Sequence, residues 1–505
     1  MNQTIGRRDF LKRAGLGMAG AALMPRLGWT QTTERQGDKA TKPNIVFILS
    51  DDFGWGSAGC YGANPKLVRT PNIDRLAREG RRFTDACAPA SVCSPTRYAV
   101  LTGRYCWRTP LKYEVLGVFD PLWIEPSRIT VASLLRQHGY HTAAIGKWHL
   151  GYGSSKPVDY TKLLRPGPLS VGFDVHFGVP QNHGDITGVY VDCEHVQGLR
   201  SAQLKPMGAC YYGGKPFLGF DAPQRKDEDV MEVLTTRAID WIKEQTSERP
   251  FFLYFTPVAV HRPITPSSQT KGTSKAGPFG DWIHELDRSV GRVLAELDNR
   301  GFTSNTLVIF TSDNGSMKPQ NGDEAVAIKA GLQVNGAWRA GKHSIYEGGL
   351  REPYLARWPG KIPAGTVCNE PISLVDTLAT IAAIIGAQLP PPAHGAEDSY
   401  NILPALLGET LTAPLRPALV EHSADGVFAV RSGPWKWIEG HCAKPKKPKG
   451  ERAVEYHEQL YNLQDDPAEQ HDMLTQHPDV AQRLATLLDK YRTQGSSRPD
   501  DQTKE

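Results

Sequence analysis

Two pairs of oxygen-bearing side chains directly follow apolar stretches of the sequence. Asp51 and Asp52 come after the run at residues 44–50, and Asp313 and Asn314 come after the run at residues 307–311. Carboxylate and amide oxygens are the ligands that calcium and magnesium prefer. Adjacent aspartates also end many strands as turn or helix caps. Because both pairs follow an apolar run, the sequence predicts a site for one hard divalent cation, either calcium or magnesium.

The elements that must position these side chains form an alternating pattern. The continuous apolar run at residues 44–50 predicts a strand buried on both faces. Further strands are predicted at 142–145, 251–256 and 307–311, and helices at 71–80, 130–138, 227–246, 281–299 and 374–386. This alternation predicts an α/β fold with a large mixed, mainly parallel sheet sandwiched by helices. Ligands bind at the carboxyl ends of strands in such sheets, where both pairs stand.

The rest of the chain predicts a smaller C-terminal subdomain of an antiparallel sheet plus a helix. Its elements are a hairpin-like pair at 427–431 and 435–439, a strand at 460–463 and a helix at 480–491. The expected parts are a signal peptide and linker (1–40), a catalytic α/β domain (43–390), the α+β subdomain (391–495) and a disordered tail (496–505). The Gly-rich and Pro-rich stretch 152–225 is expected to form loops. The lysine run at 444–449 is interpreted as a solvated loop, with contact to a polyanionic substrate as the alternative.

Residues 1–26 contain five basic residues and one acidic residue, which together account for the whole formal net charge of +4. Without them the chain is neutral, so the charge does not favour nucleic-acid binding. The segment Arg7–Lys12 resembles the twin-arginine export pattern R-R-x-F-L-K and precedes a weakly apolar, Gly-rich stretch. An amphipathic first helix is the alternative, which the glycines disfavour. We therefore expect export by the twin-arginine translocase to the periplasm or outside the cell, with no transmembrane anchor after processing.

The most specific motif is Cys-Ser-Pro-Thr-Arg at residues 93–97, followed by Leu-Thr-Gly at 101–103. Alone it is short, and most single cysteines are small buried hydrophobes. It resembles the C-x-P-S-R signature of the type I sulfatases, of the arylsulfatase and N-acetylgalactosamine-6-sulfatase kind within the alkaline phosphatase superfamily. That resemblance extends over residues 43–491. It implies that a formylglycine-generating maturation enzyme oxidises Cys93 to formylglycine (3-oxoalanine), whose hydrate attacks the sulfur of a sulfate ester.

The resemblance also assigns roles to the other polar positions. Gly-Lys-Trp-His-Leu-Gly at 146–151 and Gly-Lys at 341–342, before Glu-Gly-Gly-Leu-Arg-Glu-Pro at 347–353, resemble family motifs. It implies that the metal, calcium more often than magnesium, is held by Asp51, Asp52, Asp313, Asn314 and the modified Cys93. The implied catalytic residues are Cys93, Arg97, Lys147, His149, His261 and Lys342. Among them Lys147 binds sulfate, His149 promotes its release, and His261 and Lys342 act on the leaving group.

The expected function is hydrolysis of sulfate monoesters, with a sulfated carbohydrate as the partner by family analogy. One alternative is a phosphate or phosphonate ester hydrolase of the same superfamily. Another is an unmodified, inactive protein that binds metal and sulfated glycan. The walls that select the substrate are expected from loops 105–125 and 152–225 and from the C-terminal subdomain. Candidates there are Lys112, Tyr113, His176, His183 and Trp338. For each of them, a packing or solvent-facing role is an equal alternative to contact with the substrate.

Overall fold

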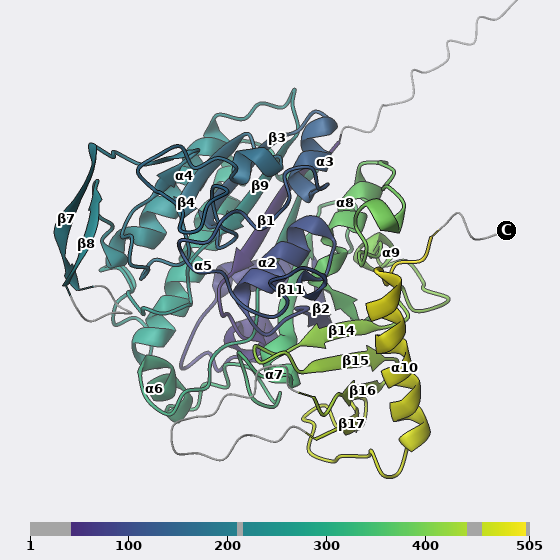
Figure 1. Ribbon diagram of the computed structural model, residues 1–505. Coiled ribbons are helices and arrows are strands. Elements are labelled where there is room, and N and C mark those ends of the chain that lie inside the picture. Colours follow the sequence, from purple (N-terminus) through teal and green to yellow (C-terminus); the bar gives the residue numbers. More distant parts are fainter. Residues whose placement is uncertain (1–41, 210–215, 442–456, 501–505) are drawn as a thin grey trace, which may run out of the picture. The chain divides into compact units, whose positions relative to one another are not determined.

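A long mixed sheet organises the protein, as seen in a computed structural model that describes residues 42–209, 216–441 and 457–500 (Figure 1). Its strands run in the order β12-β2-β11-β10-β1-β9-β3-β4-β5-β6, and β13 also pairs with β2. The strands are β1 (Asn44–Ser50), β2 (Arg81–Cys87), β3 (His141–Lys147), β4 (Val175–Val179), β5 (Val191–Asp192), β6 (His195–Val196), β9 (Phe251–Thr256), β10 (Thr306–Ser312), β11 (Arg351–Arg357), β12 (Thr366–Cys368) and β13 (Ile372–Ser373).

The centre of this sheet is parallel and its flanks are mixed, since β12 and β13 also pair in parallel with β2. Strand β1 lies between β9 and β10 and is parallel to both, and β9 continues in parallel to β3 and β4. Strand β11 runs antiparallel to β10 and β2, and β5 runs antiparallel to β4. The predicted mixed, mainly parallel sheet is confirmed.

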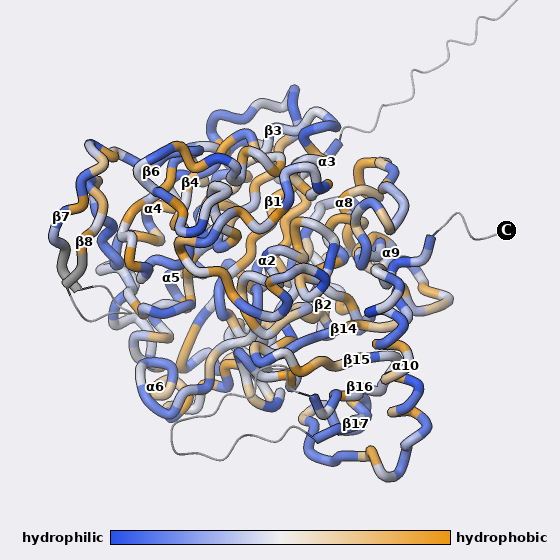
Figure 2. The backbone as a smooth tube through the Cα atoms, viewed as in Figure 1, coloured by the Kyte–Doolittle hydropathy of each residue, from blue (hydrophilic) through white to orange (hydrophobic). Residues whose placement is uncertain are grey.

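Side chains of β1 enter two separate hydrophobic cores. Ile45 and Phe47 pack in one core with residues of α2 (Cys93–Thr102), α3 (Val131–Gln137) and α8 (Thr377–Ile384). Val46 and Ile48 pack in the other with residues of α1 (Pro71–Glu79), α4 (Val230–Lys243) and α5 (Gly277–Asn299). Since every residue of β1 is buried, helices cover both faces of the sheet, and Figure 2 shows hydrophobic stretches along its central strands.

A second, antiparallel sheet follows near the C-terminus. It contains β14 (Leu419–His422), β15 (Phe428–Ser432), β16 (Trp435–Ile438) and β17 (Gln459–Asn462). Helix α10 (Pro478–Gln494) packs Leu484 and Leu488 against this sheet, and it is the yellow helix beside β15 and β16 in Figure 1. The predicted smaller sheet plus helix is confirmed, while the domain boundary at residue 390 stays a prediction.

The stretch 152–225 contains more regular structure than expected. Strand β4 extends the large sheet, and β7 (Ser201–Ala209) pairs with β8 (Pro216–Asp221). The sequence of β4, Val-His-Phe-Gly-Val, is short and interrupted by glycine, so its strand state depends on pairing with β3. That pairing needs the glycine, because a Cβ on Gly178 would lie 1.8 Å from the carbonyl oxygen of Gly146.

Two further expectations concern the ends of the chain and the membrane. Residues 1–41, with the expected signal peptide, lie outside the described residues, as do the lysine run at 444–449 and residues 501–505. Within the expected tail, Arg498 donates hydrogen bonds to the carbonyls of Pro390, Gly395 and Ala396. Among the helices that the structure describes, none combines the length and apolarity needed to cross a membrane.

Candidate active site

Parallel pairing of β1 and β10 brings the two predicted oxygen-bearing pairs together. The register aligns Ser50 with Ser312, so the residues that follow leave the sheet side by side. The backbone N–H of Asp52 donates to Asp313 Oδ1 at 3.2 Å, and Asn314 Nδ2 donates to Asp52 Oδ1 at 2.7 Å. Asp51, Asp313 and Asn314 are fully buried. The sequence therefore concentrates carboxylates at the carboxyl edge of the sheet.

Helix α2 brings Cys93 and Arg97 to the same place. Cys93 is the first residue of the helix, and its Sγ lies 3.8 Å from Asp51 Oδ1. Arg97 stands one turn later on the same face. Its Nε donates to Asp313 Oδ2 at 2.9 Å, its Nη2 lies 2.7 Å from the same oxygen as an ion pair, and the side chain is fully buried. Thr96, which replaces the serine of the commonest family motif, donates to the Ala90 carbonyl at 3.1 Å.

Two buried lysines complete the charge balance. Lys147, at the end of β3, places Nζ 2.7 and 2.9 Å from the carboxylate oxygens of Asp51. Lys342 places Nζ 2.8 Å from Asp52 Oδ2 and 3.7 Å from Cys93 Sγ. With Arg97 and Asp313, three cations face three carboxylates. Burial opposes ionisation of the two adjacent aspartates, but Lys147 holds the pKa of Asp51 below its ordinary value and Lys342 does so for Asp52.

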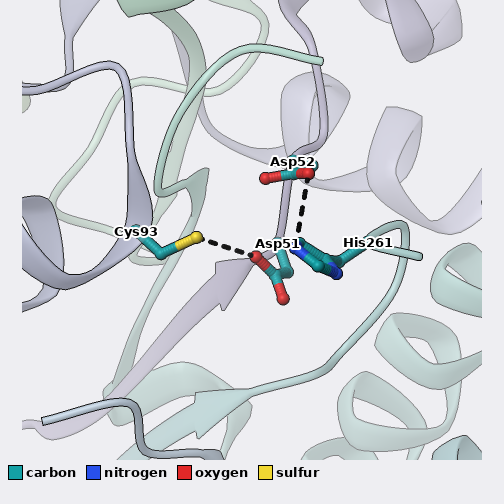
Figure 3. Close-up of side chains that lie close together, drawn as sticks. All are labelled: Asp51, Asp52, Cys93 and His261. Atoms are coloured by element: carbon teal, nitrogen blue, oxygen red, sulfur yellow. Dashed lines mark hydrogen bonds and ion pairs between the residues drawn. The ribbon is translucent and has the colours of Figure 1, made fainter. Parts of the chain in front are cut away.

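His261 approaches the aspartates from the loop after β9. Its Nε2 lies 3.8 Å from Asp52 Oδ2, and its Nδ1 contacts the Arg262 carbonyl at 2.6 Å. A carbonyl only accepts, so Nδ1 carries the proton and Nε2 presents its lone pair in the neutral ring. Burial, with Lys342 nearby, lowers the pKa of His261. Figure 3 shows Cys93 and His261 pointing toward the two aspartates from opposite sides.

One ring nitrogen of His149 is hydrogen-bonded, and the other has no partner among the described residues. Its Nε2 contacts the Leu116 carbonyl at 2.9 Å, so that nitrogen is the donor. Its Nδ1 is buried and has no hydrogen-bond partner among the described residues. Burial, with Lys147 and Arg97 nearby, holds the pKa of His149 well below its ordinary value. His149 is therefore a neutral ring with an available lone pair.

The donor set fits a hard divalent cation. Asp51, Asp52, Cys93 and His261 each offer an atom within 4.8 Å of the others. Asn314 Oδ1 is buried without a partner in the described part of the chain, as an amide oxygen reserved for a cation would be. This group contains His261, which was predicted as catalytic, while Asp313 faces Arg97. The five predicted ligands thus surround one place, and their roles as ligands stay a prediction.

Glu352 is a buried acid that the sequence analysis did not single out. Both of its carboxyl oxygens are buried without partners among the described residues. Burial, with Asp313 and Asp52 nearby, raises its pKa well above the ordinary value, so Glu352 holds a proton. The only sequence signal is its place in Gly-Gly-Leu-Arg-Glu-Pro, at the start of β11 beside β10. The neighbouring Glu347 instead pairs with Arg351 and Lys436 and ties α7 (Glu347–Leu350) to β16.

The five candidate substrate-selecting residues separate into distinct surroundings. His176 is a core residue bonded to Tyr152 and the Ala144 carbonyl. Trp338 packs edge-on against Trp55. His183 is buried beside the His261 loop, with Nε2 2.8 Å from the Pro263 carbonyl. Lys112 and Tyr113 line a cavity bounded by loop 105–117 and the C-terminal sheet.

Comparison with known proteins agrees with this geometry. The sulfatase family profile matches residues 43–387. The chain is 34% identical over 514 residues to an N-acetylgalactosamine-6-O-sulfatase of Bacteroides thetaiotaomicron. This alignment covers 94% of this chain and 98% of that protein. It is 35% identical to human arylsulfatase A over 89% of this chain and 87% of that protein.

A solved structure gives the same result. A Bacteroides thetaiotaomicron sulfatase from work on the metabolism of multiple glycosaminoglycans superposes with a TM-score of 0.81 at 33% identity. The match covers 90% of this chain and 100% of that one. The family profile and these relatives extend over most of the chain, including both strand ends and the Cys93 helix. The chain belongs to the sulfatase family and is a sulfuric ester hydrolase.

Proposed function

We propose that the protein removes sulfate from a sulfated carbohydrate after Cys93 is converted to formylglycine by a maturation enzyme. The observation that carries this proposal is the position of Cys93 Sγ, 3.8 Å from Asp51 and 3.7 Å from Lys342, with Arg97 one turn away. Burial raises the pKa of the Cys93 thiol to about 12. An unmodified thiol would then be protonated and weakly nucleophilic at neutral pH, which supports a modified side chain as the reactive group.

A bound divalent cation would supply charge neutralisation for the sulfate group and for the attacking oxygen. Asp51, Asp52, Asp313, Asn314 and the modified residue 93 would hold it, with calcium favoured over magnesium by family analogy. Lys147 and Lys342 orient the anionic sulfate through Nζ. Arg97 remains paired with Asp313 and fixes the first turn of α2.

Two histidines are suited to moving protons on either side of the ester. The bare Nδ1 of His149 accepts the proton whose removal releases sulfate and regenerates the aldehyde. His261 and Lys342 lie on the more exposed side, with side-chain exposures of 12% and 6%. Lys342 carries a proton and can protonate or stabilise the departing alkoxide there, and His261 does so once its Nε2 has taken up a proton. The site thus separates the sulfate-releasing base from the leaving-group acid.

The relative named N-acetylgalactosamine-6-O-sulfatase makes N-acetylgalactosamine 6-sulfate the first substrate to test. We expect its hydrolysis by purified wild-type protein and none by Cys93→Ala, which should keep its fold. Turnover by Cys93→Ala within about tenfold of wild type, roughly 1.4 kcal/mol of barrier, would contradict covalent catalysis at this residue. A phosphonate monoester in the same assay tests the alternative hydrolase, and inactivity on every ester would support the inactive glycan-binding alternative.

Export is a separate part of the proposal, supported by Arg7 and Arg8 before the Gly-rich stretch. The twin-arginine route carries folded proteins, so modification of Cys93 would precede translocation. Replacing both arginines with lysine should retain active enzyme in the cytoplasm. Unchanged export of this variant would exclude the route without affecting the catalytic proposal.

A further inference from the structure

We propose that a cavity beside the reaction centre binds the sugar next to the sulfated one, and that this neighbouring sugar carries a negative charge. The proposal rests on the proposed function. The cavity has a volume of about 440 Å³ and lies between loop 105–117, the β15–β16 hairpin and the end of α10. Its principal lining residues are Trp107, Lys112, Tyr113, Phe428, His441 and Arg492.

Two segments that line the cavity continue along the chain to residues that contact the reaction centre. On one wall, Leu116 accepts from His149 Nε2 at 2.9 Å and its N–H donates to Ser94 Oγ at 3.1 Å, next to Cys93. Lys112 is four residues away, which is at most about 14 Å of chain. On the other wall, Ala424 N–H donates to the carbonyl of His343 at 3.1 Å, next to Lys342. A substrate that extends from the reaction centre between these two segments would reach the cavity.

Aromatic rings give the cavity a fixed floor. The ring of Trp107 stacks on Tyr105, with centroids 5.6 Å apart and planes at 19°, and meets the edge of Phe428 at 5.6 Å. Trp107 Nε1 is buried and has no partner among residues 42–209, 216–441 and 457–500. Small-ligand sites combine such apolar surfaces with a few placed polar groups. Tyr105 stacks on the Trp107 ring, and the Arg108 guanidinium lies over that ring, 4.3 Å from its centroid. A sugar would therefore meet the edge of Trp107, where one of its hydroxyls can accept from Nε1.

The charges of the cavity select an acidic ligand. Arg108 pairs with Asp398 at 2.7 Å, and Arg492 pairs with Glu439 at 3.0 Å. Lys112 is exposed and forms no ion pair with any residue in the described part of the chain. It is therefore the uncompensated cation at the mouth of the cavity. A carboxylate or second sulfate on the neighbouring sugar would supply its partner.

The test measures kcat/KM for four substrates, of which 4-nitrophenyl sulfate is the simplest. The others are N-acetylgalactosamine 6-sulfate and two disaccharides in which this sugar is linked to glucuronic acid or to glucose. For wild type we expect kcat/KM for the acidic disaccharide to exceed that for the neutral one by about fivefold, as for a favourable exposed ion pair. Lys112→Ala should abolish this preference and leave the aryl sulfate and the monosaccharide within about twofold. Lys361→Ala, at another exposed lysine, is the control.

Trp107→Phe provides an independent measurement, because it keeps an aromatic ring and removes Nε1. It should lower kcat/KM for both disaccharides equally and spare the monosaccharide. Equal rates of wild type on acidic and neutral disaccharides, with no effect of Lys112→Ala, would overturn this inference while leaving the sulfatase proposal intact. Failure of wild type to cleave any of the four esters would instead overturn the proposed function itself.

Discussion

Replacing Lys147 with methionine should destabilise the metal-free protein by an amount that calcium partly restores. Lys147 Nζ contacts both carboxylate oxygens of Asp51, and both side chains are fully buried. Removing one partner of a buried ion pair costs about 3–5 kcal/mol, because the other charge stays buried. Arg97 Nη2, 3.6 Å from Asp51 Oδ1, retains part of the compensation. The lower end, about 3 kcal/mol, is therefore expected.

The measurement is thermal unfolding with and without calcium. At an unfolding entropy of about 2.1 cal/mol/K per residue, a chain of this length loses about 1 °C of Tm per kcal/mol, so Lys147→Met should lower Tm by about 3 °C in chelator. Calcium at a hundred times its Kd stabilises a native site by about 2.7 kcal/mol. Because the variant has lost the competing ammonium group, calcium should raise its Tm more than that of wild type.

The control is Lys361→Met, which should behave as wild type in both conditions because Lys361 is exposed. Equal calcium-induced shifts in wild type and Lys147→Met would refute the reasoning, since Asp51 would then not be a ligand whose affinity depends on Lys147. An unchanged Tm of the variant in chelator would show that Asp51 does not depend on this lysine.

Three further perturbations test other parts of the account. His261→Ala should slow hydrolysis of a sulfated sugar by about 10²–10⁴-fold but that of an activated aryl sulfate far less, because a phenolate needs little protonation; equal losses would make His261 a sulfate ligand only. Glu352 is protonated in the fold, whereas the unfolded chain ionises near the ordinary value of 4.5. Stability of the metal-free protein should therefore fall as pH rises above that value, by up to about 1.4 kcal/mol per pH unit, and Glu352→Gln should flatten denaturant-derived stability between pH 5 and 7, with parallel curves contradicting the assignment. Gly348→Ala should cost at least about 1–3 kcal/mol, because its Cβ would lie 2.4 Å from the carbonyl oxygens of Arg339 and Ala340, while Gly117→Ala, which meets only Asp120 at 3.4 Å, should melt as wild type.

The elements that hold the site are predictable where local pattern and tertiary environment agree. The apolar run at 44–50 is strand β1, and the run at 251–256 coincides with β9. Pro71 and Gly80 delimit α1 as their helix-end preferences suggest. Since parallel strands end at one edge, the proximity of Asp51 and Asp313 also follows from their positions after such runs.

What the sequence does not reveal depends on contacts between distant segments. Strand β4 is stabilised by pairing with β3 rather than by its own residues. The partner of His149 is the backbone carbonyl of Leu116, which carries no side-chain signature. A glutamate is ordinarily expected at the surface, so the sequence does not predict that Glu352 is buried. Its burial beside Asp313 and Asp52 arises only when β11 pairs antiparallel with β10.

The most direct test of the central claim is mass spectrometry of the peptide that contains Cys93, isolated from enzyme whose specific activity is known. The account predicts an aldehyde in place of the thiol, and a converted fraction that rises in proportion to activity on N-acetylgalactosamine 6-sulfate among preparations made with more or less maturation enzyme. Full activity in protein whose Cys93 remains an unmodified thiol would contradict the account.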